Sequence, residues 1–343
     1  MTSPVSLSPR ALMSLLVNGA KAVDVIETAL EVGLLDVLEP GPVSLREISG
    51  RLGLVPGRLY KFLDCLESLG LVRRSEGAES IEDTCYRAVP GLREAVIAVI
   101  GPDAVERDRD KYPWRQLHGR LTDTLHGRLS LTDDDFAWPP KSAGQVAEFE
   151  RSMAAGLGPV LETFRTHVRR LWPTPTRLLD VGGGDGTLAA RLLADAPELT
   201  VDVYNLPTVR PLVQQTRFQA GNPERLGFVG GDFLTEPLPT GYDALSFVRV
   251  LHDWPTPITR RLVDNAYRAL PPHGLLLICE EFRTPDRLAM QFFWSYFLIG
   301  VDSCVSRLRE IEFYADLLQD VGFRDTEVLP GPFELITARK PAA

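Results

Sequence analysis

The sequence predicts an α/β fold in which a mostly parallel, seven-stranded sheet follows an N-terminal helical domain. In the C-terminal half of the chain, apolar runs of strand length alternate with segments of helical spacing, which is typical of a parallel sheet covered on both faces. Residues 1–90 instead show mostly helical spacing. The chain has 343 residues, more than one hydrophobic core usually accommodates, so we expect two domains.

The first helices are predicted from apolar spacing and from capping residues. Apolar side chains follow helical spacing over residues 9–38 and the pattern breaks at Gly33, which predicts one long helix or two short ones. Ser44 and Glu47 form a capping box at the start of a short helix that ends near Gly53. The apolar face of the first segment exceeds what a small domain can bury, so we predict that it packs against a second subunit in a homodimer.

One more helix and two short strands complete this domain. Pro56 suits the first turn of a helix that ends at Gly70, and residues 71–74 and 84–88 are typical of the two strands of a wing. This order of elements predicts a winged helix-turn-helix over residues 1–90, which either binds DNA or serves as a dimerisation domain. The charges of the helix that would enter DNA are balanced, and the chain carries a net charge of −9. We therefore expect dimerisation and no nucleic-acid partner.

Residues 91–172 are expected to form a helical region that contributes to a pocket for a small-molecule substrate, called the acceptor pocket below. Aromatic side chains accumulate here, Trp114 and Phe149 among them, and pockets often lie where domains meet. Phe149 and Met153 are four residues apart and therefore share one helix face, which is equally consistent with an ordinary helix core. A proline-containing segment then opens the C-terminal domain, residues 173–343.

The strands of the C-terminal domain are predicted from apolar runs that end in polar residues. Five strands joined by helices should be parallel, and the last two should close the sheet as an antiparallel pair. The predicted ranges are 178–180, 200–204, 228–232, 242–251, 275–279, 325–329 and 333–339. Because parallel strands end at the same edge of a sheet, one crevice can collect the polar residues at the five strand ends. These residues are Asp180, Asn205, Asp232, His252 and Glu280.

A glycine-rich turn, Gly182, Gly183 and Gly184, follows the first of these strands. Glycine permits close approach of a ligand to the backbone, and the N-terminus of the next helix offers N–H groups and a partial positive charge. The glycine spacing does not match the dinucleotide fingerprint, and the turn lacks the Lys-Ser/Thr ending of a phosphate-binding loop. It therefore indicates a nucleotide-like site or a structural turn, and the polar strand ends that follow favour the site.

Composition argues against other classes of protein. No run approaches the ~20 apolar residues of a membrane span, and the N-terminus lacks an apolar signal segment, so we expect a cytoplasmic protein with no membrane partner. The four cysteines and five histidines show no metal-ligand spacing, so no metal is expected.

Four motifs, in this order along the chain, carry a resemblance to a known family. They are Asp180-Val-Gly-Gly-Gly, Asn205-Leu-Pro, Gly231-Asp232-Phe233 and Leu251-His252-Asp253-Trp254. Over nearly its whole length the chain resembles the class I S-adenosylmethionine-dependent methyltransferases of the plant-type, caffeate-like O-methyltransferase family, in its bacterial natural-product branch. The resemblance implies a Rossmann-like catalytic domain, a winged-helix dimerisation domain and S-adenosyl-L-methionine as cofactor.

The resemblance also implies roles for single residues. The glycine turn would approach the methionine part of the cofactor, Asn205 would hold the ribose hydroxyls, and Asp232 and Phe233 would flank the adenine. Leu206 and Arg249 are assigned to the same cofactor site. The family usually has Asp at the position of Asn205; an Asn side chain can still donate and accept a hydrogen bond there, but it loses the charge-assisted bond.

A second similarity concerns the acceptor. Asn205-Leu-Pro and the segment from Trp294 to Gly300 are similar to a bacteriochlorophyll-type C-methyltransferase branch of the family, which does not carry the His-Asp pair found here. The atom that receives the methyl group therefore stays open between oxygen and carbon. The residues expected to line the acceptor pocket are Trp114, Phe149, Met153 and Trp294.

The implied chemistry calls for a base. Methyl transfer is an in-line displacement, which is favoured by alignment and by a deprotonated nucleophile. A phenol with a pKa near 10 is mostly protonated at neutral pH, and a histidine with a pKa of about 6.5 can take its proton. His252 matches the catalytic base of the family, although it could also be structural. Glu280 either holds the imidazole tautomer or is a solvated strand end.

We therefore predict a homodimeric methyltransferase that O-methylates an aromatic hydroxyl of a small acceptor in secondary metabolism, such as antibiotic biosynthesis. C-methylation of an electron-rich ring is the nearest alternative. Two others are a reaction that uses the cofactor without methyl transfer, such as decarboxylation or hydroxylation, and a ligand-sensing transcription regulator.

Overall fold

The computed structural model describes most of the chain, which divides into two compact units. The described residues are 8–75, 80–101, 119–129, 142–221, 223–284, 299 and 307–342. One unit spans Met1–Arg115 and the other spans Gln116–Ala343. Each unit contains hydrophobic core of its own.

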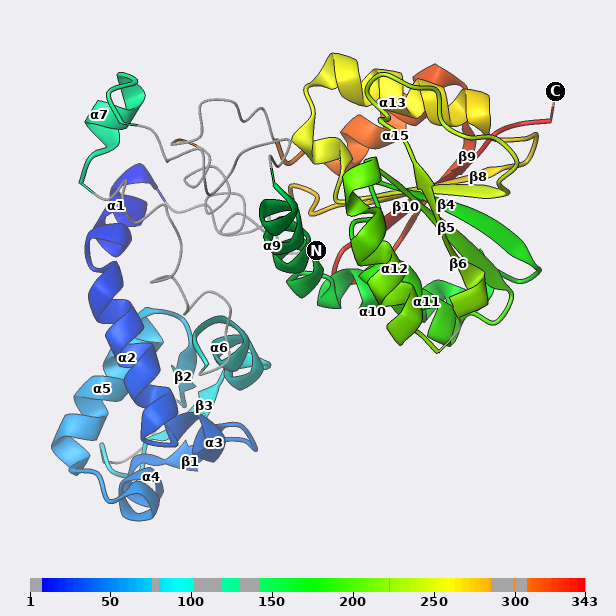
Figure 1. The fold of residues 1–343 in the computed structure, drawn as a ribbon. Coiled ribbons are helices and arrows are strands. Elements are labelled where there is room, and N and C mark those ends of the chain that lie inside the picture. The colour runs from blue at the N-terminus through cyan, green and yellow to red at the C-terminus, as the bar shows by residue number, and fades with distance from the viewer. Residues whose placement is uncertain are drawn as a thin grey trace. The chain divides into compact units, whose positions relative to one another are not determined.

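The N-terminal unit packs helices against a small antiparallel sheet (Figure 1). The helices are α1 (Pro9–Val17), α2 (Gly19–Glu31), α3 (Leu34–Leu38), α4 (Leu45–Leu52), α5 (Pro56–Ser68) and α6 (Leu92–Ile100). The strands β1 (Val43–Ser44), β2 (Val72–Arg74) and β3 (Cys85–Ala88) pair in the order β1-β3-β2. Leu34, Leu45, Ile48, Leu63 and Tyr86 are fully buried in its core.

Local signals account for these elements. The segment expected to hold one or two helices holds three, because the chain breaks at Asn18 and again at Gly33, which adopts a left-handed φ of 75° before α3. The N-cap half of the capping box is confirmed, because the Ser44 hydroxyl accepts a hydrogen bond from the Glu47 backbone N–H at 3.2 Å, whereas the Glu47 carboxylate accepts a bond from Arg51. Gly53, with φ of 66°, ends α4 as expected.

The C-terminal unit is built on the predicted seven-stranded sheet, in the order β6-β5-β4-β7-β8-β10-β9. Strands β4 to β8 are parallel, and β10 runs antiparallel to both β8 and β9. The strands are β4 (Thr176–Val181), β5 (Leu199–Asn205), β6 (Leu226–Gly230), β7 (Ala244–Val248), β8 (Leu275–Cys279), β9 (Arg324–Leu329) and β10 (Leu335–Arg339). The expected antiparallel closure of the sheet is therefore confirmed.

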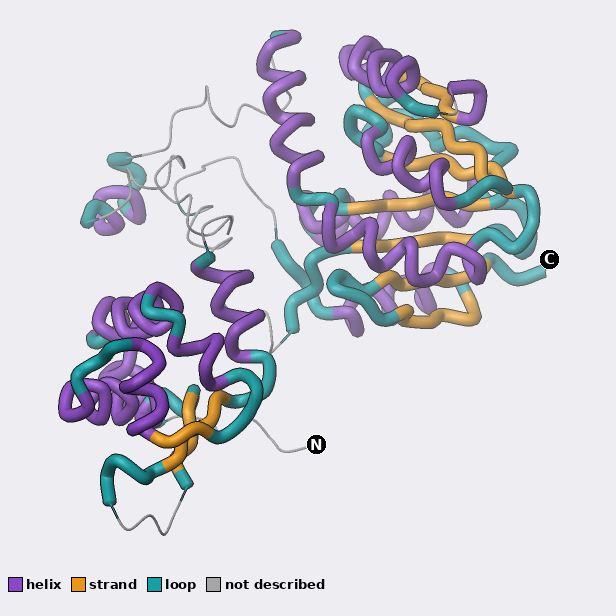
Figure 2. Tube along the Cα trace, turned by 90° about the horizontal axis from the view of Figure 1, so that it is seen from below, coloured by secondary structure: helices purple, strands orange, loops and turns teal. Residues whose placement is uncertain are grey.

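Helices cover both faces of this sheet (Figure 1). Side chains of α10 (Gly158–Leu171), α11 (Thr187–Asp195) and α12 (Arg210–Gln219) share one core cluster with the strands. Side chains of α13 (Thr256–Ala269) and α15 (Ile311–Val321) share the cluster on the opposite face. Figure 2 shows the strands running side by side with helices packed along them. The unit also contains α7 (Leu121–Leu125) and α9 (Ala143–Ala155).

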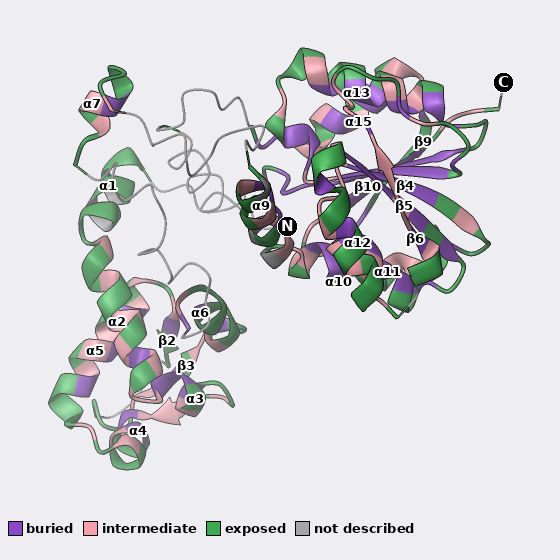
Figure 3. Cartoon of the chain, in the orientation of Figure 1, coloured by how far each residue is buried: buried purple, intermediate pink, exposed green. Residues whose placement is uncertain are grey.

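Burial along the central strands follows from this two-sided cover. All five residues of β8 are buried, and the last four of β4 are buried as well (Figure 3). A continuous apolar run is what a parallel strand between two helical layers requires, because neither of its faces meets solvent.

One predicted boundary is wrong in a way that matters for the site. The strand expected over residues 242–251 ends at Val248, because Arg249 takes a left-handed φ of 56° and turns the chain. The Arg249 backbone N–H still bonds the Cys279 carbonyl at 2.9 Å. Residues Leu251–Asp253 then form a short 3-10 helix, η5, which carries His252.

Candidate active site

The glycine turn after β4 is shaped by positive φ angles and by close neighbours. Gly182 and Gly184 have φ angles of 74° and 57°, in the region that favours glycine. A Cβ atom at Gly182 would lie 2.8 Å from Val250 Cγ2, and one at Gly184 would lie 2.8 Å from Glu150 Oε2. A larger residue at either position would therefore be strained and would collide with a side chain.

A buried carboxyl group lies beneath this turn. Asp180, at the end of β4, is 2% exposed and accepts a hydrogen bond from the Ser246 hydroxyl of β7 at 2.7 Å. Burial raises the pKa of Asp180 to about 6, against the opposing effect of that hydrogen bond. A Cβ at Gly183 would lie 2.5 Å from Asp180 Oδ2, so the carboxyl group lies against the turn and occupies the space that a side chain at Gly183 would need.

Asn205 connects the end of β5 to the glycine turn. Its Oδ1 accepts a hydrogen bond from the Leu206 backbone N–H at 2.8 Å, and its Nδ2 donates to the Gly184 carbonyl at 3.4 Å. A side-chain amide has two N–H donors and two acceptor lone pairs. These two bonds therefore leave one donor and one acceptor of Asn205 for a ligand.

The exit of β6 brings a carboxylate and an aromatic ring to the same edge. Asp232 is half-buried and accepts hydrogen bonds from the Leu234 backbone N–H and the Thr235 hydroxyl, at 2.9 and 3.1 Å. The Phe233 ring lies edge-on to Trp254, with centroids 5.9 Å apart. Phe233 Cε1 is 3.7 Å from the position of a Cβ at Gly182. The ring therefore borders the glycine turn.

His252 and Glu280 are brought together by the ends of β7 and β8. Glu280 is 1% exposed and His252 is 7% exposed. Glu280 Oε2 is hydrogen-bonded to His252 Nδ1, and Oε1 accepts bonds from the backbone N–H groups of Val250 and Leu251 at 3.1 and 2.8 Å. Glu280 is thus buried and bonded to His252, so the alternative of a solvated strand end is wrong.

The electrostatic surroundings of His252 favour its charged form. Burial by itself lowers the pKa of the imidazole, but the Glu280 charge, the Asp253 charge and the Glu280 hydrogen bond outweigh burial and raise the pKa to about 9. Nε2, the other ring nitrogen, lies 3.3 Å from Asp253 Oδ1. His252, paired with Glu280, is therefore a base whose strength approaches that of a phenolate.

Arg309 was missed by the sequence analysis, although it holds the segment that carries His252. It is 4% exposed, and its guanidinium donates to the carbonyls of Leu251 at 3.2 Å and Trp254 at 2.6 Å. Arg309 lies 55 or more residues along the chain from both carbonyls, so no local pattern could have shown this contact.

Arg249, predicted to bind the cofactor, makes a contact with α9. Its Nη1 donates to the Met153 carbonyl at 3.1 Å, and a Cβ at Gly156 would lie 2.7 Å from the same atom. Arg249 thus links the end of β7 to the C-terminal end of α9.

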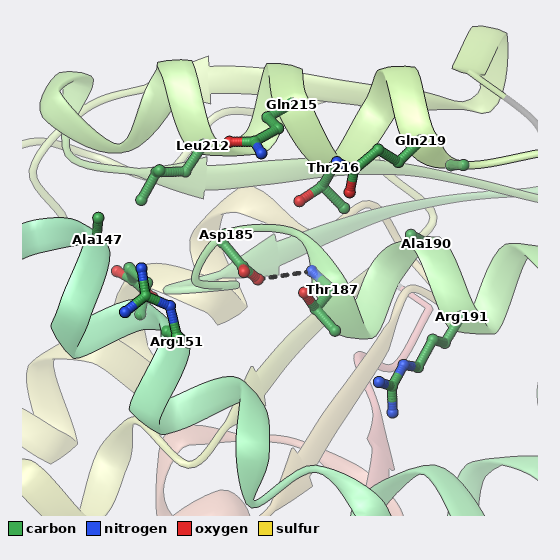
Figure 4. Close-up of a pocket in the computed structure, with 12 residues that line it drawn as sticks. Ala147, Arg151, Asp185, Thr187, Ala190, Arg191, Leu212, Gln215, Thr216 and Gln219 are labelled. Atoms are coloured by element: carbon green, nitrogen blue, oxygen red, sulfur yellow. Dashed lines mark hydrogen bonds between the residues drawn. The ribbon is translucent and has the colours of Figure 1, made fainter.

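Two of the four predicted acceptor-pocket residues lie on α9. Phe149 is 37% exposed and Met153 is half-buried. Trp114 and Trp294 lie outside the described residues. A cavity of about 410 Å³ lies between α9, the glycine turn, α11 and α12 (Figure 4). Glu150, Arg151, Asp185 and Arg191 are its charged lining residues, which makes it a polar cavity.

The residues at this edge fit a nucleoside cofactor with a charged tail. The glycine turn carries no side chains that would shield its backbone, Asn205 retains hydrogen-bonding capacity, and an aromatic ring and a carboxylate follow β6. Within the described ranges, no group of three or more His, Cys, Asp or Glu side chains is arranged to hold a metal ion. Of the helices described, none is long and apolar enough to cross a membrane.

The fold and this strand-end site define a Rossmann-like, cofactor-dependent transferase. The chain belongs to the O-methyltransferase domain family, whose model matches residues 103–324. It is a methyltransferase that depends on S-adenosyl-L-methionine. The family resemblance predicted from the sequence motifs is therefore confirmed.

Individual relatives illustrate the range of acceptors in the family. The chain is 29% identical to the N,N-dimethyltransferase OxyT of Streptomyces rimosus, over 87% of this chain and 86% of the relative. It is 28% identical to the tetracenomycin polyketide synthesis 8-O-methyltransferase TcmO of Streptomyces glaucescens, over 92% of each. It is 23% identical to the bacteriochlorophyllide d C-20 methyltransferase of Chlorobaculum tepidum, over 92% of each.

A solved structure supports the fold. The chain superposes on human N-acetylserotonin methyltransferase in complex with S-adenosylmethionine with a TM-score of 0.58, at 23% identity and over the full length of both chains.

Proposed function

We propose that the protein transfers a methyl group to the hydroxyl oxygen of a small aromatic natural product, with His252 as general base. The observation that carries this proposal is the buried pair of His252 and Glu280 at the strand edge that also holds the glycine turn. The polyketide O-methyltransferase TcmO, among the relatives, supports a natural-product acceptor that is methylated on oxygen.

We assign the cofactor to the edge formed by the ends of β4, β5 and β6. The glycine turn Gly182–Gly184 faces the methionine part, Asn205 and Leu206 face the ribose, and Asp232 and Phe233 flank the adenine. When bound, the cofactor supplies an electrophilic methyl group on a sulfonium. Arg249 is assigned to the same cofactor site. Its bond to the Met153 carbonyl connects the end of β7 with α9 there.

The proton of the acceptor hydroxyl is assigned to His252. Glu280 holds Nδ1, so we assign Nε2, which lies 3.3 Å from Asp253 Oδ1, as the nitrogen that receives the proton from the acceptor. A histidine with a pKa near 9 is well matched to a phenol, because transfer between groups of similar pKa costs little free energy. Phe149 and Met153 line the acceptor side, and Trp114 and Trp294 are assigned to the same pocket.

The N-terminal unit is proposed to form the dimer interface. Leu12, Leu16, Val17 and Val23, on α1 and the first half of α2, are 44%, 62%, 78% and 45% exposed in the single chain. Such a row of apolar side chains is typically covered by a partner, and a second copy provides the same row.

Product analysis tests the reaction. The protein is incubated with methyl-labelled S-adenosylmethionine and a panel of phenols, and the product is examined by NMR. An O–CH₃ resonance supports the proposal. A C–CH₃ resonance would assign the protein instead to C-methylation, where His252 deprotonates the phenol and a ring carbon becomes the nucleophile. The bacteriochlorophyllide C-20 relative makes this the second candidate.

A further inference from the structure

Glu150, on α9, is a buried carboxyl group that the proposed reaction does not use. It is 6% exposed, whereas its neighbours Glu148 and Arg151 on the same helix are exposed. In the part of the chain that the structure describes, no hydrogen bond or ion pair satisfies its carboxyl oxygens. A buried ionised carboxylate without a partner is costly, so the group either holds a proton or binds a cation, and the described residues supply no such cation.

The carboxyl group of Glu150 faces the glycine turn. Its Oε2 lies 2.8 Å from the position that a Cβ at Gly184 would take, and α9 packs against the short 3-10 helix η3 (Pro207–Val209) that follows β5. Glu150 also lines the cavity between α9, α11 and α12 shown in Figure 4. It is therefore aimed at the place where the cofactor's methionine part is assigned.

The charges around Glu150 do not neutralise it. The other charged groups that line the cavity are Arg151 on α9, Asp185 in the turn and Arg191 on α11. Asp185 points its carboxylate at the Thr187 backbone N–H, at 2.9 Å (Figure 4). Burial, and secondly the like charge of Asp185, raise the pKa of Glu150 to about 7. Neither arginine reaches it to oppose this rise.

We propose that Glu150 binds the α-ammonium group of the cofactor's methionine part. The inference rests on the proposed placement of the cofactor at the glycine turn. An α-amino group is a cation at neutral pH, and it is the cationic end of a ligand whose nucleoside half is assigned to β5 and β6. Its N–H groups would satisfy the carboxylate oxygens, for which the described ranges of the chain provide no hydrogen-bond donor.

Two ligands isolate this contact. S-Adenosylhomocysteine carries the α-ammonium without a sulfonium charge, and 5′-methylthioadenosine lacks the amino-acid part altogether. Titration calorimetry with both ligands is performed on the full chain, on Glu150→Gln and on the control Glu148→Gln, which alters an exposed carboxylate of the same helix. We expect Glu150→Gln to weaken S-adenosylhomocysteine binding by about 10-fold to 100-fold, as for loss of a hydrogen bond to a charged group, and to leave 5′-methylthioadenosine binding unchanged.

A second readout is proton release. At pH 6.5, S-adenosylhomocysteine binding to the wild-type protein should release up to about 0.8 of a proton, because Glu150 with a pKa of about 7 is mostly protonated there and the ammonium lowers that pKa. The release is measured in two buffers of different ionisation enthalpy and should be absent in Glu150→Gln. Equal affinities of wild type and Glu150→Gln for S-adenosylhomocysteine, or equal loss for both ligands, would overturn the proposal. If the wild type binds neither ligand, the proposed function fails together with this contact.

Discussion

His252 and Glu280 form a buried, hydrogen-bonded pair although 28 residues separate them in the chain. Strands β7 and β8 are adjacent and parallel, with Val248 opposite Cys279, so their exits deliver the two side chains to one point. The second oxygen of Glu280 bonds the backbone at Val250 and Leu251. The carboxylate therefore sets both the position of the histidine and its protonation.

The first prediction concerns the base. His252→Ala should lower turnover by ~10²–10⁴-fold while cofactor affinity stays within about twofold, because the side chain is proposed to act on the acceptor and not to bind the cofactor. His252→Asn retains similar volume but accepts no proton, so it should match the alanine variant. Turnover is measured under saturating cofactor, and affinity by calorimetry. Wild-type rates in both variants at pH 7 would show that His252 is structural.

The second prediction concerns pH. With a His252 pKa of about 9, kcat/KM should rise with pH up to about 9, as the imidazole loses its proton to solvent. Glu280→Gln removes the largest influence that raises this pKa, so burial then lowers it and the rise should move to lower pH. NMR titration of the His252 ring in both proteins gives the pKa directly. An unchanged pKa in Glu280→Gln would contradict the coupling.

The third prediction concerns the cofactor edge. Gly184→Val should weaken S-adenosylmethionine binding by at least tenfold, because the side chain would enter a left-handed backbone position against Glu150. Asp232→Ala should weaken binding as well, and Thr235→Val is its matched control, because that variant removes only the bond within the turn. Calorimetry that finds wild-type affinity in the first two variants would remove this edge from the cofactor site.

The fourth prediction concerns assembly. The double variant Leu12→Asp, Leu16→Asp should convert the proposed dimer to a monomer, because it places charges within an apolar interface. Phe218→Asp, at a side chain that is 85% exposed on α12, is the control and should stay dimeric. Light scattering measures the mass. A monodisperse wild-type monomer would refute the dimer.

The fifth prediction concerns stability without ligand. The pKa of Glu150 is raised to about 7, so its contribution to stability is present below pH 4.5 and is lost as pH rises through 7. Glu150→Gln should therefore melt at a higher temperature than the wild type at pH 8, and the difference should vanish near pH 4.5. Thermal unfolding followed by circular dichroism checks both points. A lower melting temperature for the variant at pH 8 would show that the carboxylate has a partner in the folded chain.

Much of the architecture was determined by the sequence itself, because it depends on short-range patterns. Alternation of apolar runs with helical spacing gave the parallel sheet, and Ser44 with Glu47 gave a helix start that the structure confirms. The residues at the strand ends could also be predicted, since parallel strands finish at one edge. Local pattern indicated Asp232, which follows the end of β6 by two residues, whereas Phe233 was indicated only by the family resemblance.

Other features were decided only by the tertiary structure, because they depend on contacts between distant segments. Arg249 ends β7 early through a left-handed turn whose backbone N–H bonds the neighbouring strand. Arg309 bonds the carbonyls of Leu251 and Trp254, although it lies 55 or more residues away from both in the chain. No motif or spacing in the sequence distinguishes the charge of Glu150 from those of the residues beside it, Glu148 and Arg151. Packing of α9 against the glycine turn buries that charge, and burial turns an ordinary surface residue into a candidate ligand for a cation.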